Sequence, residues 1–337
     1  MRIVITGASG FVGRLLVAAL LRARTFDGEP IKRLVLADRV APDVARVSDA
    51  LVEVVHGDLV ECLDAVFAEP VDVLFHLAAA VSAECETDFD LGMRANVDTT
   101  RALLEAVRAQ SITGGPLVRV VFSSSLAVHG SDPMLPLPPV VDESTLPVPR
   151  SSYGTQKLIC EHLIADFTRR GFLDGRVVRL MTVAVRPGQP NAAASGFLSG
   201  IIREPLAGLP TTCPVQPGLR VALSSPRRTV QGILRVAEAR RGTGPGELNG
   251  RMPVHLPALT VSVADMLDTL RQVAGDAAVD LVSITPDPAV EAIVASWPAV
   301  FDNRRAAALG LRPDPNFLSV VRDHVADHAD AVTGPTG

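Results

Sequence analysis

The sequence has few of the residues that build disulfide frameworks or metal sites. Its 337 residues include only four cysteines, which are scattered and form no C-x-x-C pair. No histidine lies at metal-ligand spacing from a cysteine or from another histidine. Metal ligands normally recur at short, regular spacings, so we expect no metal site. Scattered thiols are typical of a reducing compartment, and we expect the protein to be cytoplasmic.

The chain also lacks a dense run of positive charge. It has 32 Lys and Arg against 37 Asp and Glu, which gives a net charge of -5. The pairs Arg227-Arg228 and Arg304-Arg305 are too short to form a basic stripe. Proteins that bind nucleic acid usually carry such a stripe, so we expect no nucleic-acid partner.

Long hydrophobic runs are missing as well. The chain starts directly with a strand pattern, without the charged, apolar and cleavage segments of a signal peptide. The apolar run from Leu15 to Leu21 ends at Arg22 and is too short to cross a bilayer. We therefore expect a soluble protein with no membrane partner.

In its first half the chain alternates short β-branched runs with longer helical patterns. The predicted strands are Ile3–Thr6, Arg33–Ala37, Glu53–His56, Val73–His76, Arg119–Ser123 and Arg176–Leu180. The predicted helices between them include Val12–Arg24, Asn96–Ala109 and Tyr153–Arg169. Such alternation predicts an α/β fold with a doubly wound parallel sheet, known as a Rossmann fold. The strands are apolar throughout, as expected for burial on both faces.

Beyond about Leu180 the pattern becomes irregular and rich in proline and glycine. We expect a Rossmann domain over residues 1–185 and a smaller mixed substrate-binding part over 186–330, with segments of this part able to return to the first domain. Further helices are predicted near Val263–Ala274 and Pro288–Ser296.

A glycine-rich turn directly follows the first predicted strand and opens a helix. Glycines in this context let backbone N–H groups at the helix N-terminus approach a pyrophosphate. The predicted cofactor contacts of this turn are Gly7, Ser9, Gly10, Phe11, Val12 and Gly13.

Acidic and small residues follow the next strands. Asp38 ends the second strand, where a carboxylate accepts the ribose hydroxyls and repels a 2′-phosphate, which favours NAD over NADP. Arg39 directly follows Asp38 and softens this preference. Further predicted cofactor contacts at strand ends are Asp58, Leu59, Leu77, Ala78 and Ala79.

Tyr153, the only tyrosine in the chain, lies four residues before Lys157. The two side chains therefore share one face of a helix that serines can cap. A neighbouring ammonium stabilises a phenolate and lowers its pKa, so Tyr153 can act as a base. Ser125 ends the fifth predicted strand and can hold the substrate oxygen. Ser123 is predicted to contact the cofactor.

The order of these motifs resembles the extended short-chain dehydrogenase/reductase family, which includes nucleotide-sugar epimerases and dehydratases. The match covers about residues 1–190. The resemblance implies a catalytic set of Ser125, Tyr153 and Lys157, with Lys157 also holding the nicotinamide ribose. It implies that Asn96 supports the fold beside the cofactor. It also implies that Thr182, which follows the sixth strand, lies near the cofactor. It also implies a homodimer, with the helices Asn96–Ala109 and Tyr153–Arg169 pairing across the axis.

Several other segments resemble dehydrogenases of this family that oxidise C2 of a four-carbon sugar acid with NAD. They include the stretch from Arg186 to Ser195 and the stretch from Ser225 to Arg228. A sugar acid needs a cation for its carboxylate, and a bidentate arginine is well suited. The candidate substrate-binding residues, besides Tyr153, are Ser82, Ser125, Arg186, Asn191, Ser195 and Arg227.

Two alternatives remain open at this point. A nucleotide-sugar epimerase or dehydratase is disfavoured by Thr182, by Val221-Ala222-Leu223 and by Leu126, where such enzymes usually carry other residues. A non-catalytic NAD(H)-sensing protein is disfavoured because Tyr153 and Lys157 are both present.

Overall fold

The computed structural model describes residues 1–41, 49–188 and 193–332. Within this part of the chain the largest sheet has seven strands, all parallel, in the order β12-β8-β7-β6-β1-β4-β5. The strands are β1 (Arg2–Thr6), β4 (Arg33–Asp38), β5 (Val52–His56), β6 (Val73–His76), β7 (Arg119–Ser125), β8 (Asp174–Leu180) and β12 (Val254–His255). The predicted doubly wound parallel fold is confirmed.

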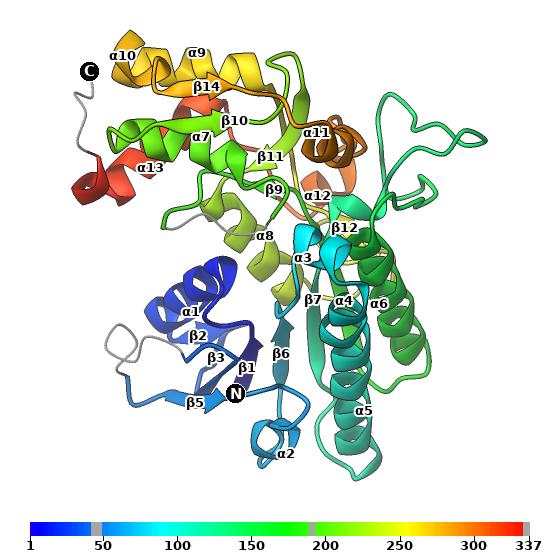
Figure 1. Cartoon of the computed structure of the whole chain (residues 1–337). Coiled ribbons are helices and arrows are strands. Elements are labelled where there is room, and N and C mark those ends of the chain that lie inside the picture. Colours follow the sequence, from blue (N-terminus) through cyan, green and yellow to red (C-terminus); the bar gives the residue numbers. More distant parts are fainter. Residues whose placement is uncertain (42–48, 189–192, 333–337) are drawn as a thin grey trace.

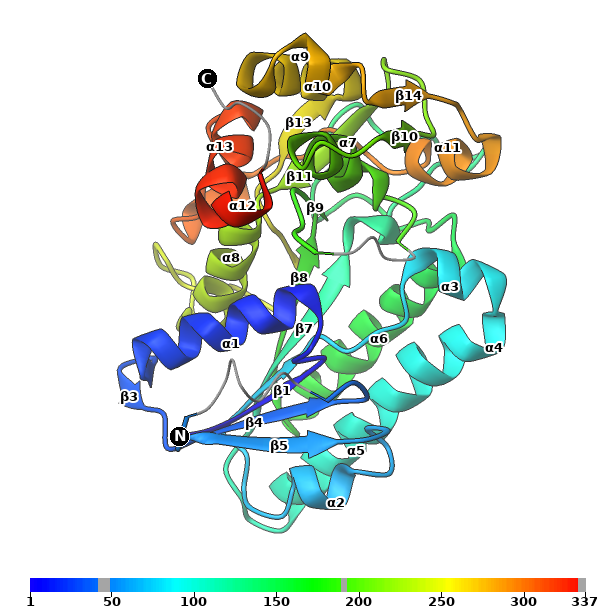
Figure 2. The same cartoon turned by 60° about the vertical axis from the view of Figure 1, so that its left-hand side comes forward.

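Helices cover both faces of this sheet (Figures 1 and 2). One face carries α1 (Phe11–Ala23) and α8 (Pro226–Glu238), and the other carries α5 (Thr99–Ile112) and α6 (Ser152–Arg169). Neighbouring residues of β1 show why both faces are apolar. Ile3 and Ile5 pack into the core under α1 and α8, whereas Val4 packs into the core under α5 and α6. Successive side chains of a strand point to opposite faces, so a strand covered on both sides is apolar throughout.

The predicted helix Asn96–Ala109 corresponds to α5 together with the end of a π-helical stretch, η2 (Met93–Asp98), which runs directly into α5. The short helices α3 (Ser82–Thr87) and α4 (Phe89–Gly92) precede this stretch. A hairpin of β2 (Thr25–Phe26) and β3 (Glu29–Pro30) follows α1, with Gly28 at φ +80° in its turn. The short helices α2 (Leu63–Val66) and η3 (Leu126–Val128) follow β5 and β7, and η4 (Ala329–Ala331) is the last element of the described residues.

The second part of the chain builds its own apolar core over smaller sheets. Among the described residues, β9 (Thr182–Val183), β11 (Arg220–Ser224) and β13 (Leu259–Ser262) form one sheet, and β10 (Thr211–Cys213) pairs with β14 (Val282–Ile284). The helices around them are α7 (Phe197–Leu206), α9 (Val263–Ala274), α10 (Asp276–Val279), α11 (Pro288–Ala295), α12 (Arg304–Ala308) and α13 (Phe317–Asp327).

Two elements from this second part return to the large sheet. Strand β12 pairs with β8 at the sheet edge, and α8 packs beside α1. The buried Arg176 of β8 joins α8 to the sheet, because its Nη1 donates to the carbonyls of Val236 and Ala239 at 2.8 and 2.7 Å. An arginine here satisfies carbonyls at the C-terminal end of α8 that have no partner within the helix.

Candidate active site

A cleft of about 290 Å³ opens at the carboxyl ends of the central strands. This is the edge at which parallel α/β sheets bind their ligands. Residues from β7, α6 and β9 line it together with the glycine-rich turn. The predicted cofactor residues that line the cleft are Gly7, Gly10, Phe11, Val12, Gly13, Leu77, Ala79, Ser123, Tyr153, Lys157 and Thr182.

The glycine-rich turn needs glycine at two positions for steric reasons. Gly7 has φ +71°, and a Cβ there would lie 2.6 Å from the backbone N of Ala78. A Cβ on Gly13 would lie 2.1 Å from the carbonyl oxygen of Gly7. Helix α1 begins immediately after the turn and has no side-chain cap among the described residues. Its first N–H groups and its dipole are therefore suited to a pyrophosphate.

Asp38 lies at the end of β4, beside the glycine turn. Its carboxylate accepts hydrogen bonds from the backbone N–H groups of Ser9 and Val40, at 2.8 and 2.9 Å. These bonds orient the carboxylate beside the turn, where a ribose would lie next to the pyrophosphate. Arg39, Asp58, Leu59 and Ala78 also lie at strand ends outside the cleft lining.

The three predicted catalytic residues meet in this cleft. Tyr153 is the second residue of α6, which begins after Ser151, whose Oγ accepts from the N–H of Gly154 at 3.1 Å. Ser125, at the end of β7, lies near enough to the Tyr153 hydroxyl to act on its pKa, and both residues line the cleft. Lys157 Nζ lies 5.6 Å from the Tyr153 ring centroid and donates to the Ser123 carbonyl at 2.8 Å. The carbonyl bond and the helix hold Lys157 one turn below Tyr153.

Burial controls the pKa values of this pair. Desolvation raises the pKa of Tyr153 to about 12, although the Ser125 hydroxyl and the charge of Arg186 act in the opposite direction. Desolvation also lowers the pKa of Lys157 to about 8. The expected lowering of the tyrosine pKa by Lys157 therefore does not hold for the protein alone. The physical reason is that burial destabilises the charged phenolate more than the neighbouring hydroxyl and the arginine charge stabilise it.

We expect the sole tyrosine of the folded protein to remain protonated well above its usual midpoint of about 10. In a phenolate absorbance titration without nucleotide, the signal should stay flat through pH ~10, because burial disfavours the phenolate. Unfolding in guanidinium should restore a midpoint near ~10 as a control. A midpoint at or below this value in the folded protein would contradict the prediction.

Asn96 lies on η2, outside the cleft lining, and supports the site from behind. It is buried, its Oδ1 accepts from the N–H of Ala80 at 2.8 Å, and its Nδ2 donates to Gln156 Oε1 at 2.7 Å. It thus joins the loop after β6 to helix α6, next to Lys157. The geometry suits the fold-supporting role expected of it.

A buried polar network lies under the catalytic strand end and joins four elements, α6, β7, β8 and β12. Glu161 of α6 accepts from Ser124 Oγ at 2.5 Å, and both of its oxygens are bonded to Arg179 of β8, at 2.7 and 2.9 Å. Arg179 Nη1 also lies 3.0 Å from His129 Nε2 and 3.2 Å from His255 Nε2. All five side chains are buried, so the network clamps α6, β7 and β8 together behind Ser125.

The candidate substrate residues divide into two groups. Ser82, Arg186 and Ser195 line the cleft, and Ser82 Oγ accepts from the N–H of Ala194 at 3.1 Å. Arg186 Nε donates to the Val183 carbonyl at 2.8 Å, which holds the guanidinium near Tyr153. Asn191 lies outside the described residues.

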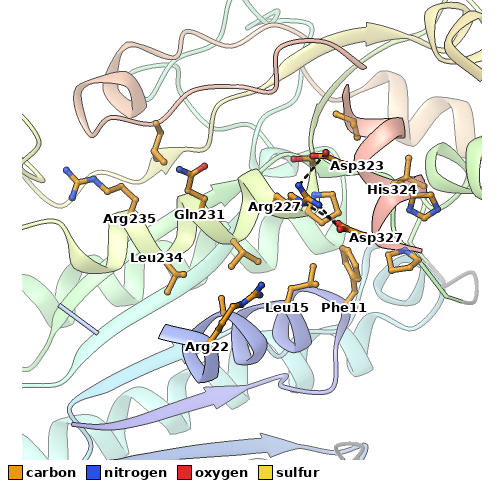
Figure 3. A pocket seen from close by; sticks show the side chains of 18 of the residues that line it. Phe11, Leu15, Arg22, Arg227, Gln231, Leu234, Arg235, Asp323, His324 and Asp327 are labelled. Carbon is orange, nitrogen blue, oxygen red and sulfur yellow. Dashed lines mark hydrogen bonds and ion pairs between the residues drawn. The ribbon is translucent and has the colours of Figure 1, made fainter. Parts of the chain in front are cut away.

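Arg227 is not brought to this cleft. It lies on α8, lines a different cavity and forms an ion pair with Asp327 of α13 at 2.6 Å (Figure 3). Helix α8 packs on the outer face of the sheet beside α1, whereas Arg186 follows β9 at the carboxyl edge. Of the two arginines, the structure therefore places only Arg186 beside the catalytic residues.

Several cleft residues were not predicted from the sequence. Trp297, which follows α11, lines the cleft together with Val81, Leu126, Leu180, Met181, Val183 and Ala193. Trp297 is the only tryptophan of the chain. A single tryptophan in a chain can indicate a binding residue. However, Trp297 lies more than a hundred residues from Arg186 in the sequence, and no motif around it predicts that it lines this cleft.

The described part of the chain contains neither a metal-binding cluster nor a membrane-spanning helix. No group of three His, Cys, Asp or Glu residues there is arranged to hold a metal ion. No helix there combines the length and apolar character needed to cross a bilayer.

The fold and the cleft define an NAD-dependent oxidoreductase, and comparison with known proteins supports this class. Residues 3–219 match the NAD dependent epimerase/dehydratase family, and the chain belongs to it. A D-erythronate dehydrogenase from Cupriavidus necator is 48% identical over 97% of this chain and 98% of that protein. A D-erythronate dehydrogenase from Haemophilus influenzae is 41% identical over 96% of this chain and 99% of that protein.

Solved structures agree on the fold. A crystal structure described as a nucleoside-diphosphate-sugar epimerase from Agrobacterium tumefaciens has a TM-score of 0.89 and 38% identity, covering 98% of this chain and 95% of that chain. An L-threonine 3-dehydrogenase from Trypanosoma brucei has a TM-score of 0.81 at 20% identity, covering 100% of this chain and 99% of that chain. At this low identity the second likeness concerns the fold alone.

Proposed function

We propose that this protein oxidises C2 of D-erythronate, a four-carbon sugar acid, to the 2-keto acid with NAD, and that Tyr153 is the base. The relatives from Cupriavidus necator and Haemophilus influenzae support the substrate. The observation that carries the proposal is the meeting of Ser125, Tyr153, Lys157 and Arg186 in one cleft beside the glycine turn.

The residues present fit NAD. The uncapped start of α1 and the crowded glycines at 7 and 13 form a backbone surface for the pyrophosphate. Asp38 is suited to the adenosine ribose, and Lys157 to the nicotinamide ribose. When bound, NAD supplies the hydride acceptor for the hydrogen on substrate C2.

The side chains of the cleft handle the proton and the orientation of the substrate. Ser125 donates to the C2 oxygen and holds it beside the Tyr153 oxygen. Burial disfavours the Tyr153 phenolate in the protein alone, so the positive charge of oxidised NAD would have to favour it in the complex. In the phenolate form Tyr153 takes the hydroxyl proton as the C2–H bond breaks, which leaves a keto group at C2. The ammonium of Lys157, one helix turn away, favours the phenolate form during this transfer.

Arg186 is the proposed carboxylate-binding residue. Its guanidinium lies near Tyr153 in a partly buried position, where a charge-assisted bond to a carboxylate is strong. Ser82 and Ser195 are proposed to hydrogen-bond the remaining hydroxyls, and Asn191 stays a candidate for the same role. In this arrangement the bond between the substrate carboxylate and Arg186 determines that C2 faces Tyr153.

We expect Arg186→Ala to raise the KM for the sugar acid by about 30-fold or more, because a charged hydrogen bond contributes roughly 2 kcal/mol or more. The matched control is Arg227→Ala, which removes an arginine outside the cleft and should leave this KM within about twofold. Initial rates of NADH formation measure both. Equal KM increases in the two variants would contradict the assignment.

A nucleotide-sugar epimerase is the alternative suggested by the name of the Agrobacterium tumefaciens structure. The two D-erythronate dehydrogenases argue against it, because they are 48% and 41% identical to this chain over nearly its whole length. The deciding experiment incubates the protein with NAD and either D-erythronate or a nucleotide sugar. Stoichiometric NADH with D-erythronate supports the proposal. Conversion of the nucleotide sugar without net NADH would replace it, and NAD binding without any turnover would point to a sensing protein.

We also propose a homodimer in a cytoplasmic location. Helices α5 and α6 lie side by side on one outer face, where a second copy could add its own pair (Figure 2). The four cysteines are free, as is usual in a reducing compartment. Sedimentation at micromolar concentration tests the dimer, and a monomer would overturn it.

A further inference from the structure

A second cavity, larger than the catalytic cleft, lies between α1, α8 and α13 (Figure 3). Its volume is about 620 Å³. This falls within the roughly 300–1,000 Å³ typical of sites that enclose a small molecule. None of the cofactor or substrate roles proposed above uses this cavity, although Phe11 lines both it and the cleft.

The walls of the cavity are largely apolar. Phe11, Leu15 and Ala19 are spaced four residues apart, so they form one stripe along α1. Val230 and Leu234 face this stripe from α8, and Leu234 points toward it in Figure 3. The remaining apolar lining comes from Val185, Pro187, Pro226, Leu309, Leu311 and Val320.

The charged residues at the edge of the cavity balance one another. Three arginines, at positions 22, 227 and 235, lie among the lining residues together with Glu238, Asp323 and Asp327. Arg227 is held by both aspartates, at 2.6 Å from Asp327 and 3.4 Å from Asp323. This balance favours an uncharged ligand over an anion or a cation, because neither sign finds an excess of opposite charge.

His324 is a polar residue in the lining of this cavity. Its side chain comes from α13 and is only 7% exposed. Burial lowers the pKa of His324 to about 4, so the ring is neutral near physiological pH. A neutral imidazole offers one donor and one acceptor, so a ligand with one hydrogen-bonding group can bond this ring.

We propose that this cavity binds a small uncharged amphipathic molecule, whose ring or short chain lies on the stripe of Phe11, Leu15 and Ala19 and whose single hydrogen-bonding group reaches His324. The volume, the apolar walls, the charge balance and the neutral imidazole in the lining each point to this class of ligand. A ligand here would also press on Phe11, the first residue of α1, and so alter the affinity for NAD. Such coupling is reciprocal, so NAD would alter the affinity for the ligand by the same factor.

The test uses 1-naphthol and naphthalene as probes of the folded full-length chain, with binding measured by calorimetry. Ala19→Phe fills the cavity, and Ala18→Phe is its matched control because Ala18 is exposed on the same helix. We expect 1-naphthol to bind the wild type and Ala18→Phe alike, and Ala19→Phe at least about tenfold more weakly. Equal binding by all three chains would overturn the site, as would equal weakening in both variants.

His324→Leu separates the hydrogen bond from the apolar contact. A neutral hydrogen bond contributes about 1 kcal/mol, so the wild type should prefer 1-naphthol to naphthalene about fivefold. In His324→Leu this preference should disappear while naphthalene still binds. A preference that is unchanged in this variant would overturn the role of His324.

Two further outcomes concern the occupant and the coupling. If a second copy of the chain covered the cavity, 1-naphthol binding would fall as protein concentration rises, and the proposal would fail. The Kd for NAD, measured with and without saturating 1-naphthol, should differ about threefold or more in the wild type and not in Ala19→Phe. An unchanged Kd would overturn the coupling through Phe11. Both readouts are binding measurements, so they do not depend on the sugar-acid substrate.

Discussion

Replacing Tyr153 with phenylalanine should lower kcat by about 100- to 10,000-fold, the range that a positioned general base contributes. The substitution removes only the hydroxyl beside Ser125 and leaves the ring in the cleft. Ser125 and Lys157 remain to hold the substrate oxygen and the ribose. Because the ring stays in place at the start of α6, the Kd for NAD should change little.

Initial rates with the sugar acid and a separate titration with NAD measure the two quantities. Ser125→Ala serves as the comparison, since it removes an orienting donor and not the proton acceptor. Its loss in kcat should be smaller than that of Tyr153→Phe. A Tyr153→Phe enzyme that retained a tenth or more of the wild-type kcat would remove Tyr153 from the role of base.

Replacing Glu161 with alanine should lower the free energy of unfolding by about 3–5 kcal/mol, as is usual when one partner of a buried ion pair is removed. The variant leaves Arg179, which is 2% exposed, as an uncompensated buried cation. It also removes the acceptor for Ser124 Oγ. The loss of unfolding free energy should therefore be larger than for replacing an uncharged buried side chain of similar size with alanine.

Guanidinium unfolding followed by circular dichroism measures this effect. The matched control is Asp268→Ala, which breaks the exposed ion pair with Arg271 and should cost about 1 kcal/mol or less. The double variant Glu161→Met with Arg179→Met should be more stable than Glu161→Ala, because neither charge is then left alone. If Glu161→Ala were as stable as Asp268→Ala, the buried ion pair of Glu161 and Arg179 would not contribute to stability as proposed.

Local sequence patterns were sufficient for the parts of the site that belong to single elements. The turn at Gly7 to Gly13 has steric requirements that only glycine meets, and these are visible as a spacing in the sequence. The pair Tyr153 and Lys157 needs only a helix to share a face. The six predicted strands correspond to β1, β4, β5, β6, β7 and β8. Burial on both faces explains the apolar run of an inner strand such as β1, whereas β5 at the sheet edge is largely half-exposed or exposed.

Features that depend on distant contacts could not be predicted in this way. Arg186 and Arg227 both lie beside proline in the sequence, and only the path of β9 and α8 sends them to different cavities. Trp297 reaches the cleft through the packing of the smaller sheets. The π-helical stretch around Asn96 lacks any proline or glycine interruption that would indicate it, and its shape follows from contacts with Ala80 and Gln156.

The return of β12 to the sheet edge has a consequence for how the protein is made. The ribosome completes β8 at Leu180, but the strand that pairs with it, Val254–His255, is synthesised only after α8 and β11. Until then β8 is an open edge with unpaired backbone groups, and its buried Arg176 lacks the carbonyls of Val236 and Ala239. A nascent chain that ends near residue 185 therefore holds every catalytic side chain of the Ser-Tyr-Lys set but not a finished sheet. We expect stable folding to begin only when about three quarters of the chain has left the ribosome, well after the catalytic sequence has emerged.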